Sequence, residues 1–132
     1  DDRLKTVNVC DYEKDFPSKD FVNYSFRVLS GKPVKLSDLD REILAADSNP
    51  LFEERCFADY GFFKSFTMTE QLRKAKSINH LGEGQNIIFS DNSVKFTPDR
   101  KHLGDDIYTV QGADSYTGFE KPADYADVFL AP

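Results

Sequence analysis

Hydrophobic side chains in the first half of the chain recur every three to four residues, which is the spacing of amphipathic helices. Serine, threonine and asparagine residues stand where helix N-caps would be; Ser48 and Asn49 precede Pro50, and Thr67 begins a capping box that ends at Glu70. Acidic residues follow them in the first turns, where the helix dipole favours negative charge. The pattern predicts four helices, over residues 18–29, 37–47, 50–61 and 67–80.

The period of the pattern changes to two in the second half of the chain. Residues 86–90 and 93–97 alternate around Asp91 and Asn92, which tolerate the positive φ angles of a two-residue hairpin turn. Further strands are expected over residues 5–10, 106–110, 116–119 and 128–130. Because helices precede most strands without βαβ alternation, the chain predicts a single α+β domain over residues 1–132. In this fold about four N-terminal helices pack on one face of a small C-terminal antiparallel sheet.

Five of the twelve phenylalanines lie between residues 50 and 66, and Cys56 lies among them. Each buried phenylalanine contributes roughly 1.5–3 kcal/mol, so this stretch is expected to anchor the core. A disulfide with Cys10, the other cysteine, is the simplest use of the pair. Two cysteines this far apart suit neither a four-cysteine zinc site nor a CxxC redox motif. The alternative is two buried free thiols.

A disulfide predicts an oxidising compartment, periplasmic or extracellular. The opening residues, Asp1-Asp2-Arg3, include neither an initiator methionine nor an apolar leader, as in a mature secreted chain; a chain trimmed at this point would look the same. No apolar run reaches the roughly eighteen residues of a membrane span, so membrane insertion is not expected. The glycosylation sequon at Asn23 falls inside a predicted helix, and such short patterns often arise by chance.

Composition and charge narrow the classes of partner. Hydrophobic residues make up 39% of the 132 residues and aromatic residues 14%, which indicates a folded globular protein. The net charge of −6 disfavours nucleic acid as a partner. Residues 73–104 carry six basic and three acidic side chains, whereas residues 105–132 carry one basic and six acidic ones. The C-terminal segment therefore predicts attraction to a basic partner.

The sequence contains no catalytic or metal-binding motif, and neither a cofactor nor a metal is expected. His80 and His102 lie beside glycine-containing turns and charged residues, where histidines are ordinarily surface residues. Glu53 and Glu54 could serve in acid–base chemistry, but adjacent helical residues diverge and a first-turn position explains both. No catalytic residue is therefore assigned.

Acidic and aromatic residues are interspersed with glycine and proline between residues 112 and 127, so both kinds of side chain are expected on surface loops. Aromatic groups supply contact area in interfaces, and clustered acids steer association with a basic partner. Alternatively, the aromatic residues cover the sheet while the acids face water. The binding interpretation selects Asp114, Tyr116, Phe119, Glu120, Asp124, Tyr125 and Asp127.

The favoured hypothesis is a small exported protein-binding module, of inhibitor or immunity type, whose acidic aromatic C-terminal loops engage a basic partner protein. The alternative is a small-molecule-binding or hydrolytic domain, in which helices wrap a curved sheet around a phenylalanine-lined pocket, as in the NTF2-like fold. This analogy rests on element order alone. The sequence does not indicate an oligomeric state.

Overall fold

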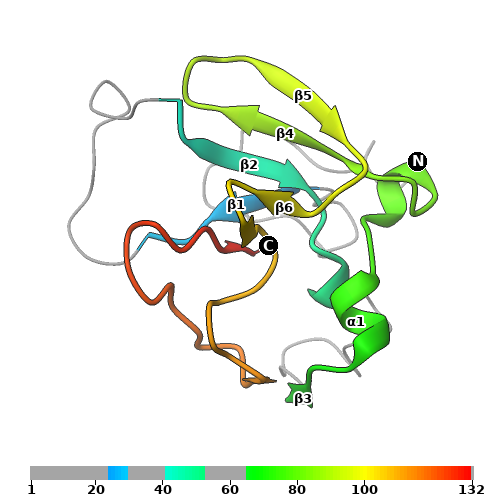
Figure 1. Cartoon of the computed structure of the whole chain (residues 1–132), viewed down its shortest axis with the longest axis vertical. Helices are drawn as coiled ribbons and strands as arrows, with labels where there is room; N and C mark the ends of the chain where they lie inside the picture. Colours follow the sequence, from blue (N-terminus) through cyan, green and yellow to red (C-terminus); the bar gives the residue numbers. More distant parts are fainter. Residues whose placement is uncertain (1–23, 30–40, 53–64, 132) are drawn as a thin grey trace, which may run out of the picture.

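The computed structural model of the chain describes residues 24–29, 41–52 and 65–131, and most of its regular structure is β-sheet (Figure 1). Five strands form one antiparallel sheet in the order β5-β4-β2-β1-β9. The first two strands of the described chain therefore lie inside the sheet, and the last strand forms one edge. The strands are β1 (Tyr24–Arg27), β2 (Ile43–Asp47), β4 (Gln85–Phe89), β5 (Val94–Thr97) and β9 (Leu130–Ala131).

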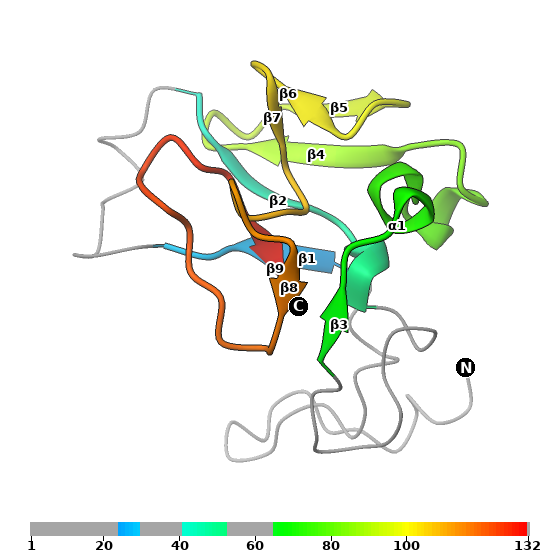
Figure 2. The same cartoon turned by 60° about the horizontal axis from the view of Figure 1, so that its bottom comes forward.

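The other described elements are short. A pair of two-residue strands, β3 (Phe66–Thr67) and β8 (Ser115–Tyr116), lies apart from the main sheet, below it in Figure 2. A second pair joins β6 (Lys101–His102) to β7 (Asp105–Asp106). The single α-helix among the described residues, α1, follows β3; it covers Glu70–Lys74, and 3₁₀ turns cover Pro50–Phe52 and Ile78–His80.

The predicted α+β class, with about four helices on a small C-terminal sheet, is wrong: the described residues are mostly sheet. The first predicted helix, 18–29, contains β1, in which Ser25 is buried while Tyr24 and Phe26 are about half exposed. Ser25 turns inward because its hydroxyl accepts a hydrogen bond from the backbone amide of Asn49 at 2.9 Å. The aromatic positions that suggested an inward helix face are therefore the exposed positions of a strand.

The second predicted helix, 37–47, contains β2. This strand lies between β1 and β4 and is buried at most of its positions. A strand covered on both faces shows a continuous apolar run in place of alternation, and leucine and alanine also favour helices. The pairing with β4 shifts register between Ile43 and Ala45, which further obscures a period of two.

The third predicted helix, 50–61, is described only as far as Phe52, and its first residues form a 3₁₀ turn. Asn49 does act as an N-cap, because its side-chain oxygen accepts the Leu51 amide at 2.9 Å. Cys56 and the remainder of this stretch lie outside the described residues, as does Cys10. The predicted disulfide therefore stays a prediction.

The fourth predicted helix, 67–80, is confirmed only over the five residues of α1. The helix begins after Thr69, whose hydroxyl accepts the Leu72 amide at 3.2 Å, and not at a capping box formed by Thr67. It ends at Ala75, whose backbone is extended. The chain then forms the separate 3₁₀ turn at Ile78–His80, which a second cap, Ser77, begins.

The predicted hairpin is confirmed. Ile88 of β4 lies opposite Val94 of β5, and the Phe89 amide donates to the Ser93 carbonyl at 2.9 Å, so the turn is one residue longer than the predicted two. Asn92 has the expected positive φ, 65°, but Asp91 does not. The predicted strand at 106–110 overlaps β7 only at Asp106, and residues 107–110 are not strand. The strands predicted at 116–119 and 128–130 correspond to the two-residue strands β8 and β9, each displaced by one residue or more. The hairpin could be predicted from its turn residues, whereas the positions of the short strands depend on the strands with which they pair.

The core lies between the main sheet and the C-terminal part of the chain. One cluster joins β2 and β4 to later residues, through Ile43, Ala46, Ile87, Phe89, Ile107, Tyr108, Val128 and Leu130. A second cluster contains Val110, Tyr116 and Phe129, and the rings of Phe66 and Tyr116 stack at 5.1 Å. The acidic C-terminal segment is therefore built into the fold.

Candidate functional site

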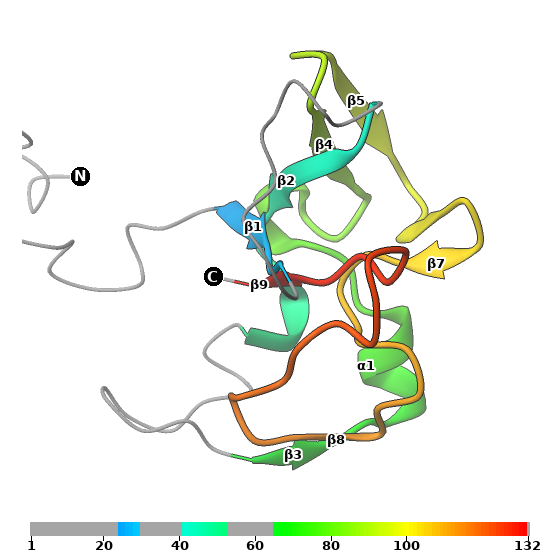
Figure 3. The ribbon, with the colours of Figure 1, turned by 90° about the vertical axis from the view of Figure 1, so that its left-hand side faces the viewer.

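The candidate site is the chain between β8 and β9, residues 117–129, here called the C-terminal loop. Figure 3 shows it leaving β8 and returning to β9. Asp127 fixes the end of the loop that leads into β9. It is 1% exposed, and its carboxylate accepts hydrogen bonds from the backbone amides of Gln111, at 3.1 and 3.2 Å, and Ala123, at 2.7 Å. Asp105 adds a further anchor by accepting the Val128 amide at 2.7 Å. Two carboxylates therefore fix the loop from inside.

Tyr125 connects the C-terminal loop to the main sheet. The Arg27 guanidinium donates to the Tyr125 carbonyl at 2.7 Å and lies 4.9 Å from the centre of its ring. Arg27 also pairs with Glu42 at 3.0 Å, and only 4% of its side chain is exposed. Tyr125 itself remains 46% exposed, so one face of the ring packs on a fixed cation while the rest stays accessible.

The turn at residues 117–120 presents Phe119, which is 89% exposed. The Glu120 carboxylate accepts hydrogen bonds from the Thr117 amide, from the Thr117 hydroxyl at 3.0 Å and from the Gly118 amide at 2.9 Å. Gly118 has a φ of 93°, a conformation that glycine adopts without strain. Partial burial acts to raise the pKa of Glu120, but the hydrogen bonds from Thr117 and Gly118 outweigh it and hold that pKa below its ordinary value.

Two further acids selected from the sequence lie at the surface. Asp124 is exposed and accepts hydrogen bonds from the amides of Ala126, at 2.7 Å, and Asp127, at 3.2 Å. Asp114, just before β8, forms an ion pair with Arg73 of α1, and 75% of its side chain is exposed. Both carboxylates face solvent; that of Asp124 also holds the local backbone, whereas that of Asp114 contacts the Arg73 side chain.

Tyr116 occupies the core and has no exposed surface. Its hydroxyl accepts the Val110 amide at 3.0 Å, and burial raises the pKa of its phenol. Of the seven predicted binding residues, the structure thus places Tyr116 and Asp127 inside and leaves five accessible: Asp114, Phe119, Glu120, Asp124 and Tyr125. Sequence spacing alone could not separate the two groups.

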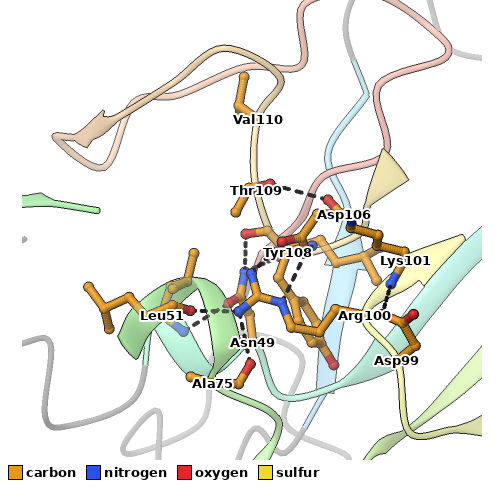
Figure 4. A network of polar contacts seen from close by, with 12 residues as sticks. Asn49, Leu51, Ala75, Asp99, Arg100, Lys101, Asp106, Tyr108, Thr109 and Val110 are labelled. Atoms are coloured by element: carbon orange, nitrogen blue, oxygen red, sulfur yellow. Dashed lines mark hydrogen bonds and ion pairs between the residues drawn. The ribbon is translucent and has the colours of Figure 1, made fainter. Parts of the chain in front are cut away.

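Arg100 forms a buried polar hub that the sequence did not single out (Figure 4). It is 5% exposed, and it makes a two-pronged ion pair with Asp106 at 2.8 and 3.1 Å. The same guanidinium donates to the carbonyls of Leu72, at 2.7 Å, and Ala75, at 2.8 Å, at the end of α1. Arg100 thereby ties the helix to the chain that leads into the core.

Asn49 is a second buried residue that sequence reasoning assigned only as a cap. Its side-chain amide donates to the carbonyl of Tyr108 at 3.0 Å (Figure 4) and to the carbonyl of Leu130 at 2.7 Å. The Tyr108 hydroxyl in turn donates to the carbonyl of Asp47 at 2.8 Å. These bonds join segments up to 81 positions apart in sequence, so no local pattern could have revealed them.

His80 lies against the sheet, where its Nε2 is 2.9 Å from the Asp47 carboxylate. Asp47 is buried and also accepts the Asn86 amide at 2.5 Å and the Asn79 side-chain amide at 3.1 Å. The pair fastens the 3₁₀ turn to β2 and β4. Within the described ranges, no group of three histidine, cysteine or acidic residues is arranged to hold a metal ion.

Three of the described phenylalanines, Phe52, Phe66 and Phe129, pack against one another beside the second core cluster. Phe52 contacts Phe66 edge-to-face at 6.5 Å and Phe129 at 6.1 Å. The cavity that the structure shows between α1 and residues 98–101 is lined mainly by charged side chains. None of the helices described here has the length and apolar character of a membrane span.

Comparison of the chain with protein-family models, with curated protein sequences and with solved structures finds no match.

Proposed function

We propose that the protein is a small protein-binding module, of inhibitor or immunity type, that engages a basic partner protein through its C-terminal loop. Phe119 is the anchor of this interaction, and Tyr125 and the exposed acids supply the other contacts. The proposal keeps the partner class expected from the sequence and restricts the contact residues to the accessible ones.

The observation that carries the proposal is the exposure of Phe119 on a turn that the Glu120 carboxylate holds in one conformation. A phenylalanine exposed to water at 89% contributes nothing to the core. A rigid loop that presents an aromatic side chain loses little conformational entropy on binding, which is how preorganised binding loops gain affinity. We therefore expect Phe119 to contribute free energy to binding the partner protein and none to folding.

The charge around Phe119 sets the class of partner. Asp114, Glu120 and Asp124 each keep a carboxylate at the surface, and their hydrogen-bond donors are mostly neutral backbone amides. Charged groups at the rim of an interface mainly raise the association rate with a surface of opposite sign. A basic surface with an apolar recess for one aromatic ring is the expected counterpart.

The compartment is part of the proposal. We infer that the protein acts outside the cytoplasm, in the periplasm or the extracellular space, and the support for this is the predicted Cys10–Cys56 disulfide. An oxidising compartment is where a small inhibitor or immunity protein would meet a secreted enzyme.

The test is capture of the partner from the native source with immobilised protein, followed by binding kinetics with the purified partner. Phe119→Ala is expected to weaken the complex by about 30-fold, the loss of a hot-spot residue worth roughly 2 kcal/mol, mostly through faster dissociation. Asp114→Asn with Asp124→Asn is expected to slow association and to reduce its dependence on salt. The asparagine that replaces Asp124 keeps an oxygen to accept the two backbone amides.

Leu81→Ala is the matched control, because Leu81 is 94% exposed on a turn outside the loop. This variant is expected to bind the partner as the unchanged protein does. Asp127 is left intact, since its loss would disturb folding. Equal affinity of Phe119→Ala and Leu81→Ala for the captured protein, or an association rate that salt does not change, would refute the proposed function.

A further inference from the structure

A second charged feature lies away from the exposed surface of the C-terminal loop. The structure shows a cavity of about 400 Å³ between α1 and residues 98–101, here called the basic cavity. Its lining contains two carboxylates and five cations, Arg73, Lys74, Lys76, Arg100 and Lys101, in a protein whose net charge is −6. We propose that the basic cavity binds a small molecule through a phosphate or sulfate group.

The two carboxylates of the lining are already occupied. Asp106 is paired with Arg100 and also accepts the Tyr108 amide at 3.1 Å. Asp99 accepts the amide of Lys101 at 3.0 Å, a bond within its own turn. After the Arg100–Asp106 pair is set aside, four cations and one carboxylate face the cavity, so its lining keeps an excess of positive charge.

The four remaining cations are available to a ligand. Lys74 pairs with Glu70, and Arg73 pairs with Asp114, but both pairs are largely solvent-exposed, and exposed pairs contribute only about 0–1 kcal/mol. The Lys76 ammonium is 3.5 Å from its carbonyl partner, at the limit of a hydrogen bond. Among the described residues, the Lys101 ammonium has no partner. An oxyanion with several acceptor oxygens would satisfy these donors together.

Arg100 makes the arrangement rigid. It binds the carbonyls of Leu72 and Ala75, so the carbonyl end of α1, which would repel an anion, is covered by a cation. The same residue holds α1 at a fixed position relative to Lys101. The cations therefore line the same cavity before any ligand arrives, and a bound anion would reduce the repulsion between them.

The size and shape of the cavity define the ligand class. A volume of about 400 Å³ lies at the lower end of the roughly 300–1,000 Å³ range of small-molecule sites. Nucleic acid would require an extended basic track along the surface, and the rest of this chain is acidic overall. A compact molecule with one phosphate or sulfate group fits both the volume and the charge.

Titration calorimetry of the full chain with inorganic phosphate, sulfate and pyrophosphate, at constant ionic strength, tests the proposal. We expect saturable binding of one anion per chain. The anion that binds most tightly identifies the chemical group of the ligand. Lys76→Ala and Lys101→Ala are each expected to weaken binding about tenfold, the loss of one charge-assisted hydrogen bond. Asp99→Asn, which keeps an oxygen for the Lys101 amide, should strengthen it.

Lys95→Ala is the matched control, because Lys95 is an exposed lysine on β5 that does not line the cavity. It should bind all three anions as the unchanged protein does. An equal loss in Lys95→Ala and Lys101→Ala would mean non-specific attraction and would overturn the proposal. So would the absence of saturation with every anion, or tighter binding of a single-stranded oligonucleotide than of pyrophosphate. None of these outcomes bears on Phe119, so the two proposals fail separately.

Discussion

Replacement of Arg100 by methionine is predicted to destabilise the protein through the loss of one partner of a buried ion pair. Methionine keeps much of the apolar length of the side chain but removes all four hydrogen bonds that the guanidinium makes. Asp106, only 23% exposed, then keeps a charge whose partner is gone. Such a loss typically destabilises by about 3–5 kcal/mol.

The magnitude follows from the surroundings of the pair. Asp106 retains the hydrogen bond from the Tyr108 amide and some contact with water, which places the ion-pair contribution near the low end, about 3 kcal/mol. The two helix carbonyls lose their donor, which adds roughly 1 kcal/mol. A total of about 4 kcal/mol is a large fraction of the roughly 5–15 kcal/mol that stabilises a domain.

Urea unfolding followed by far-UV circular dichroism and tyrosine fluorescence measures the change. The double variant Arg100→Met with Asp106→Leu removes both charges and is expected to be about 2 kcal/mol more stable than Arg100→Met alone. Arg73→Met, which removes an exposed arginine from α1, is the control and should change the free energy of unfolding by at most about 1 kcal/mol. Additive losses in the double variant would refute the reasoning.

Two further predictions concern Tyr116 and the cysteines. Because burial raises the pKa of Tyr116, its contribution to stability is complete below the ordinary value of 10.0 and is lost as pH rises through the folded-state pKa. Tyr116→Phe should be less stable at neutral pH, since the Val110 amide loses its acceptor, and its stability should fall less steeply above pH 10; an unchanged slope would contradict this assignment. Protein from the native source, alkylated in denaturant without reductant, should gain no label by intact mass and should gain two after reduction. Two labels in denaturant without reductant would exclude the Cys10–Cys56 disulfide and indicate the buried free thiols.

The sequence predicted those parts of the fold that depend on neighbours in the chain. The β4–β5 hairpin was found because its alternation and its turn residue, Asn92, act locally. β1 was not predicted because the polar residue Ser25 is buried, where its hydroxyl accepts the backbone amide of Asn49, 24 positions away. Its aromatic neighbours are exposed, so the strand shows the reverse of the usual apolar-in, polar-out pattern. β2 was missed because a central strand with an irregular register shows no alternation. Both strands are therefore determined by contacts with residues that are distant in the sequence.

The candidate site was predictable in charge but not in the role of each residue. The acidic C-terminal segment is visible in the sequence, and five of its seven selected residues are accessible. Asp127 and Asp124 look alike in sequence, yet one is buried against the backbone amides of Gln111 and Ala123 while the other faces water. That difference depends on how residues 123–127 pack against residue 111, which amino-acid composition does not reveal.

The basic and acidic segments of the chain meet in the structure at the buried Arg100–Asp106 pair and at the exposed Arg73–Asp114 pair. Arg73 lines the basic cavity, and Asp114 stands just before the strand that leads into the C-terminal loop. An oxyanion in the cavity would compete with Asp114 for Arg73 and leave that carboxylate freer to attract a basic partner. Because the pair is exposed and worth at most about 1 kcal/mol, the two binding events can change each other's affinity through it by no more than about fivefold. The proposed cavity and loop sites would therefore be coupled only weakly, and each would have to draw most of its binding energy from its own residues.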